Sequence, residues 1–430
     1  MAMQSAKDPI SGEHRRDPIV VAIWALTAAF GTYFCMYMFR KPFTAAGYPM
    51  DSGWGIGLKF LLVASQVAGY TVSKFIGIKV VSELPPRFRA LGIIGLIGVA
   101  ELALVLFAVV PPPWNAACLF INGLPLGMVF GLVLGFLEGR RLTEALAAGL
   151  CASFILADGV AKSVGKWLLG LGVDEFWMPA AAGAMFLPPL AVFTWMLAGV
   201  AKPDGRDVEA RSERSTMTAA ERWSLFSKHA IGLVSIIALY LLVTVLRSLR
   251  ADFQPEIWKG LGEDAEPSVF TTTELWVSAV VLAVNGSLVM MRNNRAAFFA
   301  SLGICAAGLA WMLAVVLGRR EGLISPFGYM VMIGLGLYLP YVAIHTTVFE
   351  RLLATTRDKG TSSYLLYLAD SFGYLGYVAV LLGKGFLSSR GEILGLFENA
   401  AMVAGVAGLV LLAVATIAFT RSTRAGETAG

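Results

Sequence analysis

Long apolar stretches of about twenty residues alternate with short polar or proline-rich breaks along most of the 430-residue chain. An α-helix of this length crosses the hydrocarbon core of a bilayer. The breaks include the sequence PPPWN at residues 111–115. The pattern therefore predicts an all-α integral membrane protein with twelve transmembrane helices. The expected spans are 19–39, 58–81, 90–110, 115–137, 145–169, 177–200, 229–249, 269–291, 296–317, 323–348, 361–386 and 393–419.

One long hydrophilic stretch interrupts this pattern at residues 201–228 and leaves six expected spans on either side. Its charges are of mixed sign, which suits a solvated linker that ends in a short surface helix around Glu221–Lys228. The sequence thus predicts five parts. These are an N-terminal segment (1–18), a six-helix half (19–200), the linker (201–228), a second six-helix half (229–420) and a tail (421–430).

The composition supports a membrane location and gives the chain an orientation. The chain is 57% hydrophobic and 15% charged. Most of its 34 Lys and Arg residues fall in loops on one side of the predicted topology, together with both termini. Because loops rich in Lys and Arg stay in the cytoplasm, we expect a multi-pass protein of the cell (inner) membrane with both termini cytoplasmic. The net charge of +5 then reflects this bias, so we expect the lipid bilayer and no nucleic acid as a partner.

No pattern in the sequence indicates a catalytic or metal centre. The four cysteines lie within apolar spans and lack metal-ligand spacing. The chain has no nucleotide-binding loop and no nucleophile with a plausible base. We therefore expect no enzyme activity, no cofactor and no metal, and we expect an ion or substrate gradient to supply the energy for any transport.

Two arginines occupy equivalent places in the two expected halves. Tyr33, Tyr37 and Arg40 recur 207 residues later as Tyr240, Thr244 and Arg247. The spacing places each triplet on one helical face, and the common offset indicates a parallel repeat. Two such arginines would converge near the axis between the halves, where their planar groups suit a phosphate or carboxylate. The alternative is that Arg40 lies at the outer interface and its side chain reaches water.

Four of the other ionisable residues within the expected spans are candidates for a role in coupling, because such residues indicate ion pathways or binding sites. Asp158 and Lys162 are four residues apart, so they are either a structural ion pair or part of ion coupling. Asp370 has no Lys or Arg one turn away in its own span, so we expect a proton or cation site there unless Lys74 reaches across to it. Glu274 is a weaker candidate for coupling or gating.

Three segments carry a resemblance to a known family. YFCMYMFRKPF at 33–43 resembles the first-helix signature of the organophosphate:phosphate antiporters of the major facilitator superfamily, which include the glycerol-3-phosphate and hexose phosphate transporters. LRSLRADFQP at 246–255 is similar to that family's seventh helix, and SKFI at 73–76 is similar to its second-helix motif at Lys74. The chain departs from the pattern at Asp158, where the family has a histidine, and in a degenerate loop after the second span. The resemblance implies two pseudo-symmetric halves and exchange of an organic anion against phosphate.

These observations predict a secondary active transporter of a small organic anion that works by alternating access, either by exchange with phosphate or by proton coupling. Counting Arg40, Lys74, Lys162 and Arg247 against Asp158, Glu274 and Asp370 leaves a positive surplus, which favours an anion. The alternative is a transporter-like sensor that binds an anionic ligand without turnover. We expect a monomer. The expected substrate-binding residues are Arg40, Arg247, Tyr33, Tyr37, Tyr240, Lys74 and Thr244, and the expected coupling or gating residues are Asp158, Lys162, Asp370 and Glu274.

Overall fold

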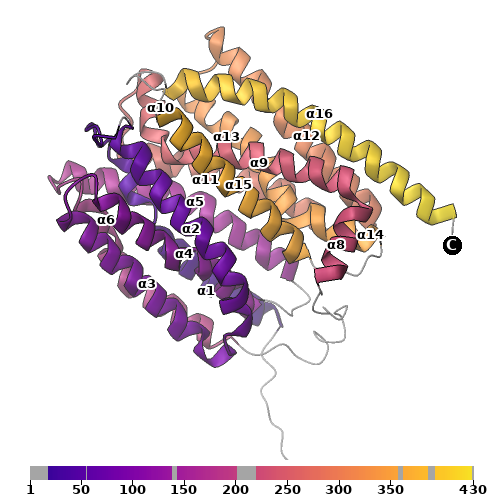
Figure 1. Cartoon of the computed structure of the whole chain (residues 1–430), viewed down its shortest axis with the longest axis horizontal. Coiled ribbons are helices and arrows are strands. Elements are labelled where there is room, and N and C mark those ends of the chain that lie inside the picture. Colours follow the sequence, from indigo (N-terminus) through magenta and orange to yellow (C-terminus); the bar gives the residue numbers. More distant parts are fainter. Residues whose placement is uncertain are drawn as a thin grey trace, which may run out of the picture.

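A computed structural model of the chain describes residues 18–54, 56–137, 143–200, 219–356, 362–385 and 393–428, and helices make up almost all of them (Figure 1). Ten helices in this part of the chain are long and apolar enough to cross a membrane. With α1 and α5 they give the twelve predicted spans. The expected N-terminal segment, apart from Pro18, and most of the linker lie outside the described residues.

The N-terminal half contains six long helices and one short one. They are α1 (Pro18–Tyr37), the 3-10 helix η1 (Pro42–Ala45), α2 (Leu58–Glu83), α3 (Pro86–Val109), α4 (Asn115–Leu137), α5 (Thr143–Gly170) and α6 (Met178–Ala198). The end of the linker forms α8 (Ala219–Lys228), where a short helix is expected.

The C-terminal half repeats this arrangement with more interruptions. Its elements are α9 (Ala230–Asp252), α10 (Gln254–Gly260), α11 (Pro267–Val289), α12 (Asn294–Arg320), α13 (Pro326–Ala343), the π-helical turn η2 (Ile344–Val348), α14 (Phe349–Thr356), α15 (Ser362–Gly385) and α16 (Ile393–Thr428). The tenth predicted span is too short, because the helix continues through η2 to Thr356. The apolar pattern ends at the first polar residues, but the backbone hydrogen bonds of the helix continue beyond them.

Local sequence explains where several helices begin. Proline is the first residue of α3, α11 and α13, a position where its missing N–H would have no partner within the helix. Ser325 caps α13 by accepting a hydrogen bond of 3.2 Å from the Gly328 N–H. Asn293 caps α12 in the same way, at 3.0 Å from the Ala296 N–H. These prolines and caps place the start of each helix in the polar residues that precede its apolar stretch.

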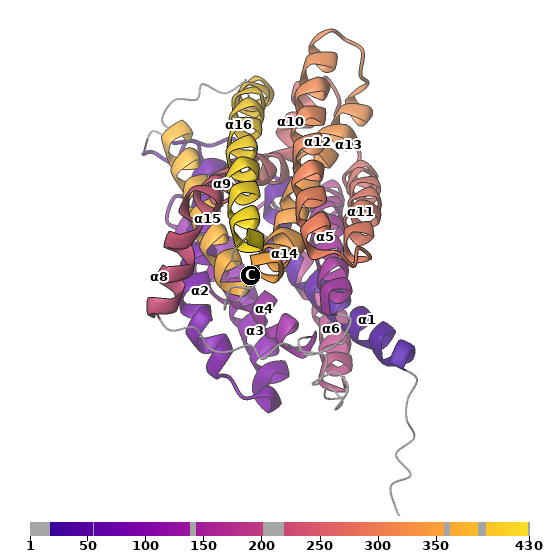
Figure 2. The same ribbon diagram turned by 90° about the vertical axis from the view of Figure 1, so that its right-hand side faces the viewer.

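The two halves contact each other through two equivalent pairs of helices. In the first pair α5 packs along α11, and in the second α2 packs along α15. Under the repeat, the second and fifth spans of the first half correspond to the second and fifth spans of the other half, which are α11 and α15. The two contacts are therefore equivalent under the repeat, and Figures 1 and 2 show the two halves side by side.

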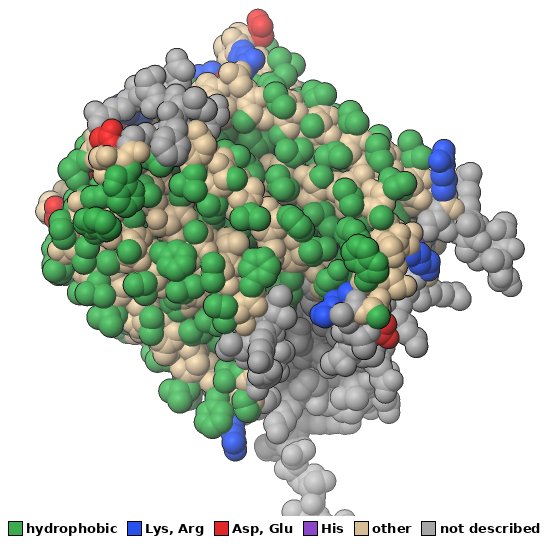
Figure 3. All heavy atoms as spheres, viewed as in Figure 1, with side chains coloured by type: hydrophobic (Ala, Val, Ile, Leu, Met, Phe, Trp, Pro, Cys, Tyr) green, Lys and Arg blue, Asp and Glu red, His purple; other side chains and the backbone are tan. Residues whose placement is uncertain are grey.

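The surface of the molecule suits a bilayer. Figure 3 shows hydrophobic side chains over most of the visible face, with Lys, Arg, Asp and Glu side chains near its edges. Large apolar side chains such as Leu91 and Trp195 are 69% and 72% exposed. Such a surface would be unfavourable in water but matches hydrocarbon.

Gly159 allows the close approach of α5 and α11 between the halves. A Cβ atom at this position would lie 2.4 Å from the carbonyl oxygen of Phe270 on α11. We expect Gly159→Ala to destabilise the folded protein by about 1–3 kcal/mol, because the two backbones would have to separate. The matched control is Gly170→Ala, in the last turn of the same helix, where the added Cβ would meet no atom within 4 Å. Thermal unfolding of the two purified variants tests this, and equal stabilities would contradict it.

Candidate functional site

The backbone at the end of α1 determines where Arg40 lies. Helix α1 ends at Tyr37, so the carbonyl groups of Phe39 and Arg40 need partners outside the helix. The Asn122 side chain of α4 donates to the Phe39 carbonyl at 3.0 Å and to the Ala100 carbonyl at 3.0 Å. The Gln66 side chain of α2 donates to the Arg40 carbonyl at 2.9 Å and to Asn122 Oδ1 at 2.8 Å. Side chains of α2 and α4 therefore hold the turn that carries Arg40, and the bond to Ala100 fixes Asn122 against α3.

We expect Asn122→Leu to reduce both stability and anion binding. The change leaves the Phe39 and Ala100 carbonyls without their buried donor, which costs about 1–3 kcal/mol for each group. Asn285→Leu is the control, because buried Asn285 donates to the Val281 carbonyl one turn away in its own helix and to no other residue that the structure describes. Thermal unfolding and ligand titration of both variants test this. An Asn122 variant that matches the Asn285 variant in both measurements would contradict it.

The two predicted arginines are buried among tyrosine rings. The Arg40 guanidinium lies over the ring of Tyr70 at 3.9 Å, and the Arg247 guanidinium lies over the ring of Tyr341 at 4.4 Å. Arg40 is 4% exposed and Arg247 is 7% exposed. The face of an aromatic ring attracts a cation, so the rings stabilise the charges without neutralising them.

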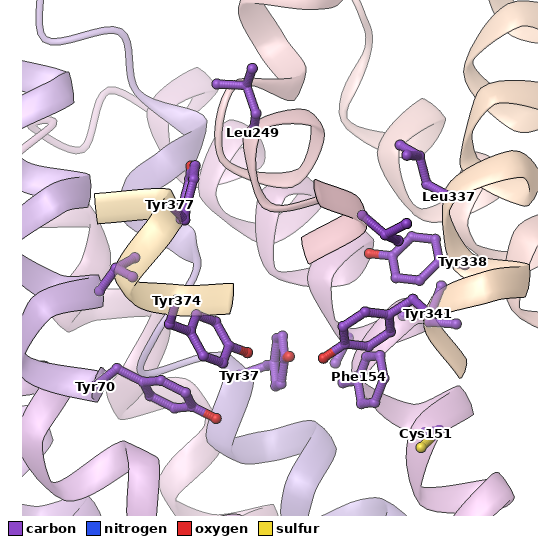
Figure 4. Close-up of a cluster of buried hydrophobic side chains, with 14 of the residues drawn as sticks. Tyr37, Tyr70, Cys151, Phe154, Leu249, Leu337, Tyr338, Tyr341, Tyr374 and Tyr377 are labelled. Carbon is purple, nitrogen blue, oxygen red and sulfur yellow. The ribbon is translucent and has the colours of Figure 1, made fainter. Parts of the chain in front are cut away.

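Tyrosines gather around the arginines from both halves. Figure 4 shows Tyr37, Tyr70 and Tyr374 pointing toward the same space as Tyr338 and Tyr341. Most of the chain's 12 tyrosines take part in this cluster. Their hydroxyl groups can donate and accept hydrogen bonds, and their rings offer flat apolar surfaces. The cluster members are Tyr33, Tyr37, Tyr70, Tyr240, Tyr338, Tyr341, Tyr374 and Tyr377.

Asp370 has a cation partner from the other half. Lys74 Nζ of α2 lies 3.4 Å from Asp370 Oδ2 of α15, and the Tyr240 hydroxyl donates to Asp370 Oδ1 at 2.5 Å. The Tyr240 hydroxyl is also 3.4 Å from His345 Nδ1, in the π-helical turn η2. The condition set by the sequence is therefore met: Lys74 reaches across to Asp370. The structure places His345 beside the tyrosine cluster.

A second group of charges comes from the turn after α1, from α5 and from the end of α9. Lys41 forms an ion pair with Asp252 at the end of α9 and lies 3.9 Å from Asp158. Asp158 pairs with Lys162 in its own helix, as the spacing of four residues allows. The hydroxyl group of Tyr377 donates to Asp252 at 2.9 Å. This group joins the two halves.

Glu274 is paired within the C-terminal half. Arg250 Nη1 of α9 lies 2.8 Å from Glu274 Oε1 of α11, and both side chains are fully buried. Gln254 Nε2 donates to the same carboxylate oxygen at 3.2 Å. The charge count made from the sequence omits Lys41, Arg250 and Asp252, which are adjacent to the candidates in space.

With these residues included, each buried carboxylate of the site has its own cation. The pairs are Asp158–Lys162, Asp252–Lys41, Glu274–Arg250 and Asp370–Lys74. Arg40 and Arg247 have no carboxylate partner among the residues that the structure describes. The Nε–H group of each is buried and donates to no acceptor among these residues. The site therefore retains two cations that can receive an anion.

The structure adds details of the site that the sequence did not give. Thr244 packs against Gly373 of α15, and its hydroxyl group has no hydrogen-bond partner among the described residues. Gln66 and Asn122 were missed, because polar residues in a span do not show which carbonyl they satisfy. Arg250 could have been found as a second arginine three residues after Arg247.

Comparison with protein families decides where the chain belongs. One family model matches residues 42–422, which is most of this chain. The chain belongs to the family of unknown function DUF5690. No curated protein matches its sequence.

Solved structures of transporters share the fold. A D-xylose-proton symporter is 12% identical with a TM-score of 0.55, covering 93% of this chain and 97% of that one. A variant of the nucleoside transporter NupG is 15% identical with a TM-score of 0.57, covering 93% and 100%. A partially occluded inward open form of the xylose transporter XylE from E. coli is 11% identical with a TM-score of 0.57, covering 92% and 96%. At these identities the likeness shows the fold alone, which is the twelve-helix major facilitator fold of a multi-pass membrane protein.

Proposed function

We propose that this protein is a secondary active transporter that carries a small organic anion by alternating access. The observation that carries the proposal is the pair of buried arginines without a carboxylate partner, one from each half. A phosphate or carboxylate group placed between them would neutralise two positive charges that no other group in the described site neutralises. The solved transporters of the same fold support a transport role, although those proteins are a sugar symporter and a nucleoside transporter rather than anion transporters.

Exchange against phosphate is the mode that the resemblance to organophosphate:phosphate antiporters favours. The tyrosine cluster would then hold the organic part of the substrate, while Arg40 and Arg247 would hold its anionic group. Phosphate could occupy the same two cations on the return step. Proton coupling through Asp370 is the alternative mode, and we expect the protein to act as a monomer in either case.

The ion pairs between the halves fit an alternating-access cycle. Lys41–Asp252 and Lys59–Glu256 join residues next to the loops that the sequence predicts to be external. Phe60 of α2 also contacts Phe253, with ring centroids 4.6 Å apart. These contacts hold the halves together at that end, so they would have to break for the site to open there.

A two-step experiment tests the proposed function. Thermal-shift measurements on the purified protein with phosphate esters, phosphonates, sulfonates and carboxylates would first identify a stabilising anion. Counterflow of that anion in proteoliposomes should then be saturable and should require protein. A sensor would bind the anion without counterflow, and stabilisation by neutral sugars alone would overturn the anion proposal.

We propose that the protein lies in the inner membrane with both termini in the cytoplasm. A cysteine in place of Ser215 in the linker should react with a membrane-impermeant reagent only after the cells are opened. A cysteine in place of Trp114 should react in intact cells, since Trp114 is 65% exposed whereas the neighbouring Asn115 is fully buried. The four native cysteines are buried and provide a low background. Labelling of both positions from the same side would end this topology.

A further inference from the structure

A surface groove lies where α8 joins α9, beside the C-terminal part of α16. It has a volume of about 450 Å³. Figure 1 shows α8 and the C-terminal end of α16 at the same end of the molecule. No residue of the candidate site lines the groove. It is therefore a separate feature of the molecule.

One part of the groove is basic. Lys228, His229 and Arg421 line it, and no Asp or Glu is among the lining residues. Lys228 and Arg421 are exposed, whereas His229 is 6% exposed and its ring lies 6.0 Å from the ring of Phe419. The positive charges can therefore meet a ligand at the surface, while the histidine forms part of the wall. This charge pattern is complementary to an anionic group.

The rest of the groove is apolar and exposed. Ile231 of α9 is 68% exposed, and Val414 and Ile417 of α16 are 39% and 54% exposed. These residues belong to the two helices that cross the membrane here, so hydrocarbon is their natural neighbour. The basic part and the apolar part are continuous, which matches a molecule with a charged head and a hydrocarbon chain.

The short helix α8 places the groove at the membrane surface. Its Trp223 is 71% exposed and stacks on Phe226 with ring centroids 6.3 Å apart. Glu221, Arg222 and Lys228 occupy the same ten-residue helix. A helix with exposed aromatic and charged residues lies along the interface between headgroups and hydrocarbon. The basic part of the groove is thus at the depth of lipid headgroups.

We propose that this groove binds one anionic phospholipid. The headgroup phosphate contacts Lys228 and Arg421, and an acyl chain lies along Ile231, Val414 and Ile417. A soluble anion would leave the apolar wall uncovered, and a soluble peptide would not reach a surface that faces hydrocarbon. The bound lipid fixes the end of the linker to the C-terminal half. This inference does not depend on the proposed transport function.

Native mass spectrometry of the full-length protein tests the site. The purified protein is titrated with phosphatidylglycerol or with phosphatidylcholine of the same acyl chains, and bound lipids are counted. We expect wild type to prefer phosphatidylglycerol, and we expect Lys228→Ala and Arg421→Ala each to weaken that lipid on the order of fivefold. Arg292→Gln is the matched control, since this exposed arginine lies in the α11–α12 loop outside the groove. It should bind phosphatidylglycerol like wild type.

A second variant tests the apolar wall without changing charge. Ala418→Trp fills the groove, so it should reduce the bound phosphatidylglycerol while the transporter stays folded by circular dichroism. Equal binding of the two lipids by wild type would overturn the proposal. Displacement of phosphatidylglycerol by millimolar inorganic phosphate would also overturn it, because the groove would then hold a soluble anion. Unchanged lipid binding in both the charge variants and Ala418→Trp would place the lipid elsewhere.

Discussion

Replacing Arg40 or Arg247 with lysine should weaken binding of the proposed anionic substrate by about 1.5–3 kcal/mol, although the charge is kept. Each guanidinium is planar and lies over a tyrosine ring, Arg40 over Tyr70 and Arg247 over Tyr341. Lysine offers a compact ammonium group that cannot donate two parallel hydrogen bonds to one phosphate or carboxylate. Because each half supplies one arginine, we expect effects of similar size from the two changes.

Ligand titration by calorimetry measures this loss once the thermal-shift screen has identified an anion. Arg319→Lys is the control, because Arg319 pairs with Glu398 at 3.0 Å near the surface and is remote from the tyrosine cluster. It should leave binding unchanged. If the Arg40 variant binds like wild type while the Arg247 variant does not, the site lies in the C-terminal half alone. If both bind like wild type, the anion site is elsewhere.

Removal of one partner from the Lys74–Asp370 pair should produce the second large effect. Both side chains are buried, and the pair joins α2 of one half to α15 of the other. Either Lys74→Met or Asp370→Asn leaves a buried charge without its partner, which destabilises a folded protein by about 3–5 kcal/mol. The double variant removes both charges, so it should be more stable than at least one of the single variants.

Unfolding of the four proteins in the same detergent forms a double-mutant cycle. Losses that simply add in the double variant would show that the two groups do not interact. Transport measurements then distinguish a purely structural role of Asp370 from a role in ion coupling. Under the alternative, proton-coupled mode, Asp370→Asn should retain exchange in proteoliposomes but lose accumulation driven by an imposed pH gradient. Accumulation equal to wild type would limit Asp370 to the ion pair and direct attention to Asp158 or Glu274.

Much of the fold follows from the sequence because a bilayer restricts the possible structures. Backbone polar groups in hydrocarbon must be satisfied within the helix, so an apolar stretch of about twenty residues has few alternatives to a spanning helix. This restriction is why the apolar pattern predicts the number of spans, and the predicted number is confirmed. The offset that relates Arg40 to Arg247 also follows from the sequence, since a repeat preserves the helical face on which each residue lies.

The partners of the charged residues were decided by the tertiary structure. Lys162 could be paired with Asp158 from spacing alone, because both lie on one helix. Lys74 and Asp370 are on different helices in different halves, and only the packing of α2 against α15 brings them within 3.4 Å. A sequence shows the face of a helix but not the rotation and depth of its neighbour, which depend on packing along the whole contact.

The sequence by itself determined a twelve-helix membrane protein with a pair of equivalent arginines near its centre. The tertiary structure decided that these two buried cations of the site have no carboxylate partner among the residues that the structure describes. That result needed Lys41, Arg250 and Asp252 to be assigned to their partners, and it also needed Asn122 and Gln66 to hold the turn at Arg40. The physical reason is that hydrophobic length is a local property of the chain, whereas neutralisation of a buried charge depends on atoms that only folding brings together.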